Sequence, residues 1–145
     1  MRSSGVFRTG IGIVAGKPPR AQAPLVICHE FLGTIEQIQG GSGRMSPGDR
    51  GVAYPLLACG TCRPCRTGHP HVCETLKLIW IDRDGGMDGY AWIDEEVLIN
   101  MPEPLSDAAA ARVEPLAVVV RSVHQAQVNL LDTTGFTGAG PICAR

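Results

Sequence analysis

Four cysteines within fifteen residues are the strongest chemical signal in the sequence. Residues 59–73 read CGTCRPCRTGHPHVC, which gives Cys59, Cys62, Cys65 and Cys73 the spacing C-x2-C-x2-C-x7-C. Two-residue spacers let neighbouring thiolates converge on one ion about 2.3 Å away. Glycines and prolines in the segment supply turns, so it can wrap a metal without a helix or sheet of its own. Four thiolates would close a tetrahedral zinc site of the structural kind.

Other ways of using these residues remain open. A bacterial ferredoxin motif would place the fourth cysteine after three residues and a proline behind it, whereas here the gap is seven residues and Glu74 follows. Disulfides are a second alternative, since four cysteines allow three pairings. A nucleic-acid zinc finger finds little support, because Arg63 and Arg66 have no basic stripe around them. His69 and His71 are expected to be exposed loop residues, since the cysteines already fill the site.

The composition of the 145-residue chain fits one globular domain. Apolar residues make up 44%, and 13 basic against 14 acidic side chains leave a net charge of −1. That balance indicates no nucleic-acid partner. The sequence has neither an apolar run of membrane-spanning length nor an apolar signal-peptide core at its start. We therefore expect a cytoplasmic protein without a membrane partner, in which thiols stay reduced.

Short apolar runs between glycines and prolines predict strands and turns in the first two thirds of the chain. We expect strands in residues 33–39, 90–93 and 96–100. Residues 47–55 predict a turn followed by a short strand.

The last third has helix-forming sequence. Ser106 is a candidate cap for a helix that begins at Asp107, and Pro115 suits the first turn of a second helix. The apolar spacing that predicts one face of this second helix involves Leu116, Val119, Val120 and Val123.

Taken in order, several segments resemble the zinc-dependent medium-chain alcohol and polyol dehydrogenases. The cysteine segment is similar to that family's structural-zinc loop. The other matching segments are HEFLGTIEQI (29–38), SPGDRGVAYP (46–55), DGGMDGYAWI (84–93), EPLAVVVRSV (114–123) and TGAGPI (137–142). They resemble the family's His-Glu segment, the turn and strand before the loop, the Gly-Gly segment, the Glu-Pro helix and the start of the nucleotide-binding fold. The Glu-Pro form is typical of the sorbitol and threonine dehydrogenase branch.

The resemblance implies a mainly β fold, a GroES-like partial β-barrel with a zinc-binding four-cysteine loop and C-terminal helices. It assigns residues 1–132 to an incomplete catalytic domain and residues 133–145 to the start of a truncated Rossmann nucleotide-binding domain. Full-length relatives oxidise a small alcohol or polyol by hydride transfer to NAD or NADP. In them a second zinc polarises the alcohol oxygen, and a hydroxyl side chain relays the proton.

Carried over residue by residue, the resemblance implies a catalytic metal site at His29, Glu30 and Glu114. His29 and Glu114 match the family's histidine and acidic ligands, while Glu30 is either a ligand or a neighbouring hydrogen-bond acceptor. Thr9 is the candidate relay hydroxyl. Phe7 stands where the family has a ligand cysteine, and it has no lone pair to offer zinc. From the residues alone, His29 also reads as a structural histidine at a strand end, and Glu114 as a helix N-terminal carboxylate.

Cys28 stands where relatives have glycine. Adjacent side chains on a strand point to opposite faces, so we do not expect Cys28 to replace the missing thiolate beside His29. Gly10 and Gly12 also depart from the family, since relatives carry a carboxylate and, often, a relay histidine there.

Gly138 and Gly140 resemble the first two glycines of a nucleotide-binding GxGxxG motif, but the third position is Cys143. The sequence ends at Arg145, and a glycine pair without its βαβ unit cannot cradle a dinucleotide. We therefore expect the isolated chain to be inactive. The alternatives are a non-catalytic zinc-binding module, which associates with itself or with an intact relative, and a decayed remnant of a dehydrogenase.

Overall fold

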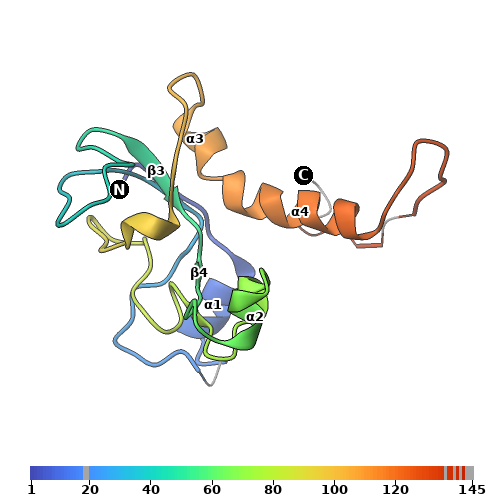
Figure 1. The fold of residues 1–145 in the computed structure, drawn as a ribbon, viewed down its shortest axis with the longest axis horizontal. Helices are drawn as coiled ribbons and strands as arrows, with labels where there is room; N and C mark the ends of the chain where they lie inside the picture. Colours follow the sequence, from blue (N-terminus) through green and yellow to red (C-terminus); the bar gives the residue numbers. More distant parts are fainter. Residues whose placement is uncertain (18–19, 136, 139, 141, 143–145) are drawn as a thin grey trace.

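A four-stranded antiparallel sheet forms the centre of the computed structural model, which describes residues 1–17, 20–135, 137, 138, 140 and 142. The strands lie in the order β1–β2–β3–β6 and comprise Ser3–Ser4, Phe31–Thr34, Arg50–Ala53 and Leu98–Asn100 (Figure 1). A separate two-stranded antiparallel sheet pairs β4 (Leu56–Leu57) with β5 (Lys77–Leu78). The mainly β architecture expected from the sequence is confirmed.

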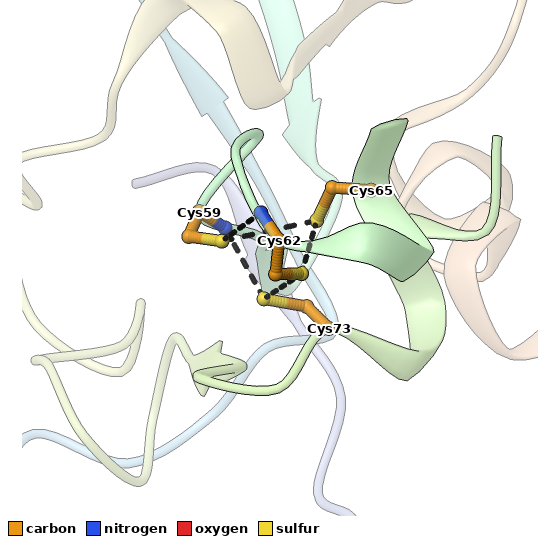
Figure 2. A group of neighbouring side chains, drawn as sticks. All are labelled: Cys59, Cys62, Cys65 and Cys73. Carbon is orange, nitrogen blue, oxygen red and sulfur yellow. Dashed lines mark hydrogen bonds between the residues drawn. The ribbon is translucent and has the colours of Figure 1, made fainter. Parts of the chain in front are cut away.

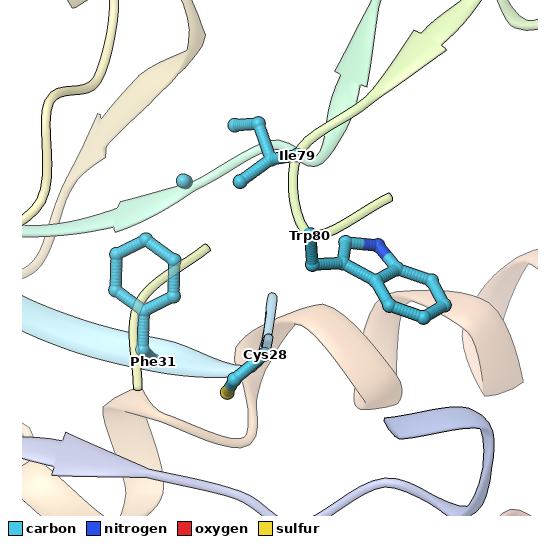
Figure 3. Packing of buried hydrophobic residues seen from close by; sticks show 5 residues of the cluster. Cys28, Phe31, Ile79 and Trp80 are labelled. Carbon is cyan, nitrogen blue, oxygen red and sulfur yellow. The ribbon is translucent and has the colours of Figure 1, made fainter. Parts of the chain in front are cut away.

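The central sheet has an apolar core on each face, because successive side chains of a strand point in opposite directions. On one face, the buried cluster consists of Cys28, Phe31, Ala53, Ile79 and Trp80 (Figure 3). On the other face, it consists of Leu32, Val52, Met101, Ala110 and Ala111. The sheet therefore lies between the turn that carries Trp80 and the start of the C-terminal helical segment.

The C-terminal helices begin where the sequence predicts them. Ser106 caps α3 (Asp107–Ala110), since its hydroxyl accepts a hydrogen bond from the backbone N–H of Ala109 at 3.3 Å. Pro115 lies in the first turn of α4 (Val113–Gln125), where a missing N–H costs nothing. Both predictions are confirmed.

The apolar face of α4 is exposed in spite of its regular spacing. The helix runs away from the sheet (Figure 1), so Leu116, Val120 and Val123 keep 48%, 60% and 43% of their surface accessible. The periodicity thus predicts the helix correctly, but in this chain it does not correspond to burial.

Two predicted strands differ from the structure. The strand expected over residues 33–39 is β2, which begins at Phe31 and ends at Thr34; one further pair of backbone hydrogen bonds joins Ile35 to residues 48 and 49. The strand expected over residues 90–93 is wrong. Tyr90 and Trp92 are 78% and 82% exposed, and no described strand pairs with this segment. Its alternating pattern therefore lacks the neighbour that a strand needs.

The strand expected over residues 96–100 is shorter than predicted. Glu95–Val97 forms a 3₁₀ turn, η2, and only the last three residues form β6. The strand expected within residues 47–55 is confirmed as β3.

Helical turns near the N-terminus and in the cysteine segment were not expected. Arg8–Val14 forms α1, although its sequence RTGIGIV contains two glycines. In the cysteine segment, Arg63–Arg66 forms the single turn α2 and Pro70–Val72 forms the 3₁₀ turn η1, so the segment does have helical turns of its own. Prolines in the first turn of both elements explain the difference, because their fixed φ suits a helix start.

Candidate metal centres

The first candidate centre gathers the four cysteines of residues 59–73. Cys59 follows β4, Cys62 is the N-terminal cap of α2, Cys65 lies within α2, and Cys73 ends the turn η1. Figure 2 shows the four side chains pointing toward a common point from these separate turns. The short helical turns therefore bring thiols from one local segment onto the same small volume.

The distances between the sulfur atoms match a tetrahedral zinc site. The Sγ atom of Cys62 lies 3.4 Å from that of Cys65 and 3.8 Å from that of Cys73, and Cys59 and Cys65 are 4.0 Å apart. Four sulfurs at about 2.3 Å from one ion would be about 3.8 Å from each other. These separations are far longer than the S–S bond of about 2.05 Å in a disulfide. The geometry supports zinc as the ion that the four cysteines bind. Residues 59–73 are called the thiol lobe below.

Backbone and hydroxyl donors favour thiolates in the lobe. The Thr61 hydroxyl and then the Cys62 N–H lower the pKa of the Cys59 thiol to about 5. The Cys59 N–H, 3.3 Å from the Sγ atom of Cys73, lowers the pKa of that thiol too. Desolvation and the Cys62 thiol raise the pKa of Cys65 to about 12. A zinc ion that binds here must displace the proton of this thiol.

His69 and His71 lie outside this thiol cluster. Both are exposed, and their ring centroids are 6.0 Å apart. The expectation that they are exposed loop residues is confirmed.

The second candidate centre brings together His29, Glu30 and Glu114. One ligand atom from each of the three residues lies within 4.8 Å of the others. His29 and Glu30 lie directly before β2, whereas Glu114 comes from the first turn of α4, far along the chain. The Nε2 atom of His29 is 3.7 Å from the Oε2 atom of Glu114. The residues that the family resemblance singled out are therefore neighbours in space.

Burial keeps the His29 imidazole neutral, which is the form that can act as a metal ligand. Only 7% of its surface is exposed, and this desolvation lowers the pKa of the imidazole to about 4. The indole of Trp80 stacks on the ring with centroids 4.4 Å apart, and the phenyl ring of Phe7 meets it edge-on at 5.4 Å. The buried Nδ1 atom makes no hydrogen bond to any residue that the structure describes. A neutral imidazole, in which one ring nitrogen keeps its lone pair, is the form that binds a divalent cation.

Glu30 is the most deeply buried acidic residue of the centre, with 3% of its surface exposed. It packs against Gly5, whose N–H donates to the Glu30 carbonyl at 2.7 Å. A Cβ atom at position 5 would lie only 2.5 Å from the Oε2 atom of Glu30. A glycine is therefore needed where the N-terminal segment crosses this carboxylate.

Phe7 and Thr9 lie at the N-terminal end of α1. Phe7 precedes the helix and contacts His29, so a phenyl ring occupies the neighbourhood for which the resemblance implies a thiolate. Thr9 is half-buried in the first helical turn, two residues further on.

Cys28 does not join the second centre. Its Sγ atom lies 3.3 Å from the carbonyl of Gly5 and 3.4 Å from that of Glu30, and it belongs to the apolar cluster of Figure 3. Burial raises the pKa of this thiol. The expected outcome is confirmed, but the strand argument behind it is wrong. Cys28 has a φ of +85°, a conformation that favours the glycine which the family has there.

The sequence did not predict that Trp80 lines the second centre, where it stacks on His29. Its indole reaches His29 from a tight turn in which Trp80 has a φ of +83° and its N–H donates to the Arg83 carbonyl at 2.7 Å. Tryptophan is unusual at positive φ, and no periodic pattern marks such a turn.

Of the two candidate nucleotide-binding glycines, Gly138 has a φ of +109°, a backbone conformation that favours glycine. Ala139, Pro141 and Cys143 lie outside the described residues, so the proposed GxGxxG segment stays a prediction. Within the described part of the chain, no helix has the length and apolar character to cross a membrane.

Comparison with known proteins agrees with this geometry. The family model of the alcohol dehydrogenase GroES-like domain matches residues 1–103. An uncharacterised zinc-type alcohol dehydrogenase-like protein of Haemophilus influenzae is 31% identical over 143 residues, which cover 98% of this chain and 42% of that protein. The chain spans about two fifths of the length of the curated relatives it matches.

Two solved structures share the fold. Galactitol-1-phosphate dehydrogenase of Escherichia coli superposes with a TM-score of 0.79 at 28% identity, over 86% of this chain and 36% of that one. The alcohol dehydrogenase RspB of Escherichia coli CFT073, solved with NADH, has a TM-score of 0.78 at 31% identity, also over 86% and 36%. The chain belongs to the alcohol dehydrogenase GroES-like domain family.

Proposed function

We propose that this chain is the metal-binding, substrate-side part of an NAD(P)-dependent alcohol or polyol dehydrogenase. The observation that carries the proposal is the second centre, in which His29 and Glu114 come from distant segments and their Nε2 and Oε2 atoms lie 3.7 Å apart. Relatives that match the chain are named as zinc-type alcohol and galactitol-1-phosphate dehydrogenases. The substrate class is therefore a small alcohol or polyol.

The residues of the second centre have separate proposed roles. His29 and Glu114 would hold a divalent cation, with Glu30 as a third donor or as the acceptor that orients the others. A cation bound there acts as a Lewis acid that lowers the pKa of an alcohol oxygen. Thr9 would relay the alcohol proton outward from its position at the start of α1. Trp80 and Phe7 exclude water from one side of the imidazole.

The nicotinamide requirement limits what the 145 residues do alone. Residues 1–132 are proposed as the catalytic domain and residues 133–145 as the start of the nucleotide-binding domain, with Gly138 and Gly140 in its phosphate loop. Among the described residues, no strand follows α4. We propose that alcohol oxidation needs a complete nucleotide-binding domain, and we expect none from residues 1–145 by themselves.

A chimaera tests the proposal. Residues 1–132 would be joined to the remaining part of Escherichia coli RspB, whose solved structure contains NADH. We expect saturable, NAD-dependent oxidation of at least one polyol by the chimaera and none by the 145-residue chain. A chimaera that binds NADH and holds two metal ions, yet oxidises no alcohol in a broad panel, would refute the proposal. Alcohol oxidation by the 145-residue chain alone would refute the claim that these residues need a further domain for activity.

The alternative is a zinc-binding interaction module. The observation that favours it is the contrast between the complete thiol lobe and the phenyl ring of Phe7 beside His29. The module would associate with itself or with an intact relative. Size-exclusion chromatography with light scattering over a hundredfold dilution tests it, because a specific complex keeps a defined stoichiometry. A monomer at all concentrations, alone and mixed with RspB, would contradict this alternative.

A further inference from the structure

The two candidate centres of this chain offer opposite kinds of donor atom. The lobe presents four sulfur atoms, whereas the second centre presents one imidazole nitrogen and the carboxylate oxygens of Glu30 and Glu114. No sulfur belongs to this second set. Phe7 contacts His29 with a phenyl ring, and the thiol of Cys28 donates instead to the backbone carbonyls of Gly5 and Glu30. Nitrogen and oxygen donors suit borderline and hard divalent cations, while thiolates select zinc.

The geometry of the second set fits a bound cation. Two ligand atoms each about 2.1 Å from one ion, at an angle near 120°, would lie about 3.6 Å apart. The Nε2 and Oε2 atoms of His29 and Glu114 are 3.7 Å apart, and the third donor lies within the same 4.8 Å cluster. His29 is more than nine-tenths buried, and its Nδ1 atom has no hydrogen-bond partner among the described residues. The imidazole is therefore not committed to a structural hydrogen bond.

We propose that the His29–Glu30–Glu114 centre is an exchangeable site for Co²⁺ or Mn²⁺ as well as zinc, and that Phe7 determines this broad selectivity. This inference rests on the proposed function for the place of the centre, and it adds the class of cation that the centre takes. Phe7 removes the soft ligand, so zinc loses more affinity than the harder ions do. The thiol lobe, in contrast, keeps zinc.

Trp80 provides a direct optical probe for this site. Its indole stacks on His29 at 4.4 Å, so a paramagnetic ion bound to that imidazole quenches its fluorescence. The chain has only one other tryptophan, Trp92, which is 82% exposed. The Trp92→Phe variant therefore leaves Trp80 as the single reporter.

The experiment titrates CoCl₂ and MnCl₂ into the 145-residue Trp92→Phe protein, with one zinc held in the lobe. We expect saturable quenching at one ion per chain for both cations. Brief EDTA treatment should reverse it, while elemental analysis still finds the lobe zinc. Glu114→Gln should raise the dissociation constant for Co²⁺ by more than about tenfold, since even neighbouring groups change metal affinity by 10–100-fold. Glu103→Gln, which changes an exposed carboxylate outside the centre, is the matched control.

Phe7→Cys tests the selectivity. In this variant we expect a thiolate-to-cobalt charge-transfer band, together with a zinc-over-manganese preference at least about tenfold larger than in the parent. An unchanged preference in a variant that shows the band would overturn the role of Phe7. Absence of saturable Co²⁺ binding, or binding that Glu114→Gln leaves unchanged, would overturn the site itself. A chimaera that binds cobalt but oxidises no alcohol counts against the proposed function only.

Discussion

A single methyl group at position 85 should destabilise the fold strongly. Residues 85–87 donate backbone hydrogen bonds of 2.7–3.0 Å to the carbonyls of residues 26–28, directly before His29. A Cβ atom on Gly85 would lie 2.1 Å from the carbonyl oxygen of Cys28, whereas Cβ atoms essentially never approach a neighbour closer than 3.0 Å. The two segments in Gly85→Ala must therefore separate by about 0.9 Å or more.

The magnitude follows from the hydrogen bonds that this separation breaks. Each backbone hydrogen bond contributes about 0.5–1.5 kcal/mol, so the loss of all three costs about 2–4 kcal/mol. In urea, a change of that size lowers the unfolding midpoint by about 1–2 M, given an m-value of about 2 kcal/mol/M. Zinc-saturated protein should be used throughout, so that the thiol lobe is in the same state in every variant.

Gly89→Ala is the matched control in the same segment. A Cβ atom there meets nothing within 4 Å, so its free energy of unfolding should stay within about 0.5 kcal/mol of the parent. If Gly85→Ala unfolds at the same urea concentration as Gly89→Ala, the close approach of the two segments is refuted.

Three further predictions concern the lobe, a helix cap and pH. Cys62→Ser should reduce zinc retention by orders of magnitude in a chelator competition, whereas Cys28→Ser should leave it unchanged, because Cys28 lies outside the lobe. Ser106→Ala should lower the free energy of unfolding by about 1 kcal/mol through loss of the α3 cap, and Ser106→Asp should retain most of it in the same urea titration. In metal-free protein, burial lowers the pKa of His29 from 6.5 to about 4, so only the unfolded state gains this proton between those values. The contribution of His29 to the free energy of unfolding is therefore complete above pH 6.5 and is lost as the pH falls toward 4, by up to about 3 kcal/mol. In His29→Gln, the urea midpoint should fall less over this pH range than in the parent protein.

Features set by neighbouring residues could be predicted from the sequence. The C-x2-C-x2-C-x7-C spacing predicts the thiol cluster, because turns within fifteen residues are enough to form it. Ser106 and Pro115 likewise act within one helical turn, and both helices begin where expected. These are local effects that need no knowledge of the tertiary fold.

Features that depend on distant neighbours could not be predicted in the same way. The pairing of His29 with Glu114 rested on the family resemblance, since no local pattern joins two residues so far apart. Trp80 was missed because its contact with His29 depends on a positive-φ turn. The exposure of Leu116 shows a related limit: apolar spacing specifies a helix face but not whether another element covers it.

The thiol lobe makes part of this chain responsive to the chemical potential of zinc. Of its four cysteines only Cys73 is buried, and most residues between 59 and 72 are exposed, so little apolar area stabilises the segment. Its order then depends on the bound ion, and well above the dissociation constant each tenfold change in free zinc alters its stability by about 1.4 kcal/mol. The central sheet, with an apolar core on each face, has no such dependence. Falling zinc activity should therefore open residues 59–73 first, in a chain whose sheet and His29 centre remain folded.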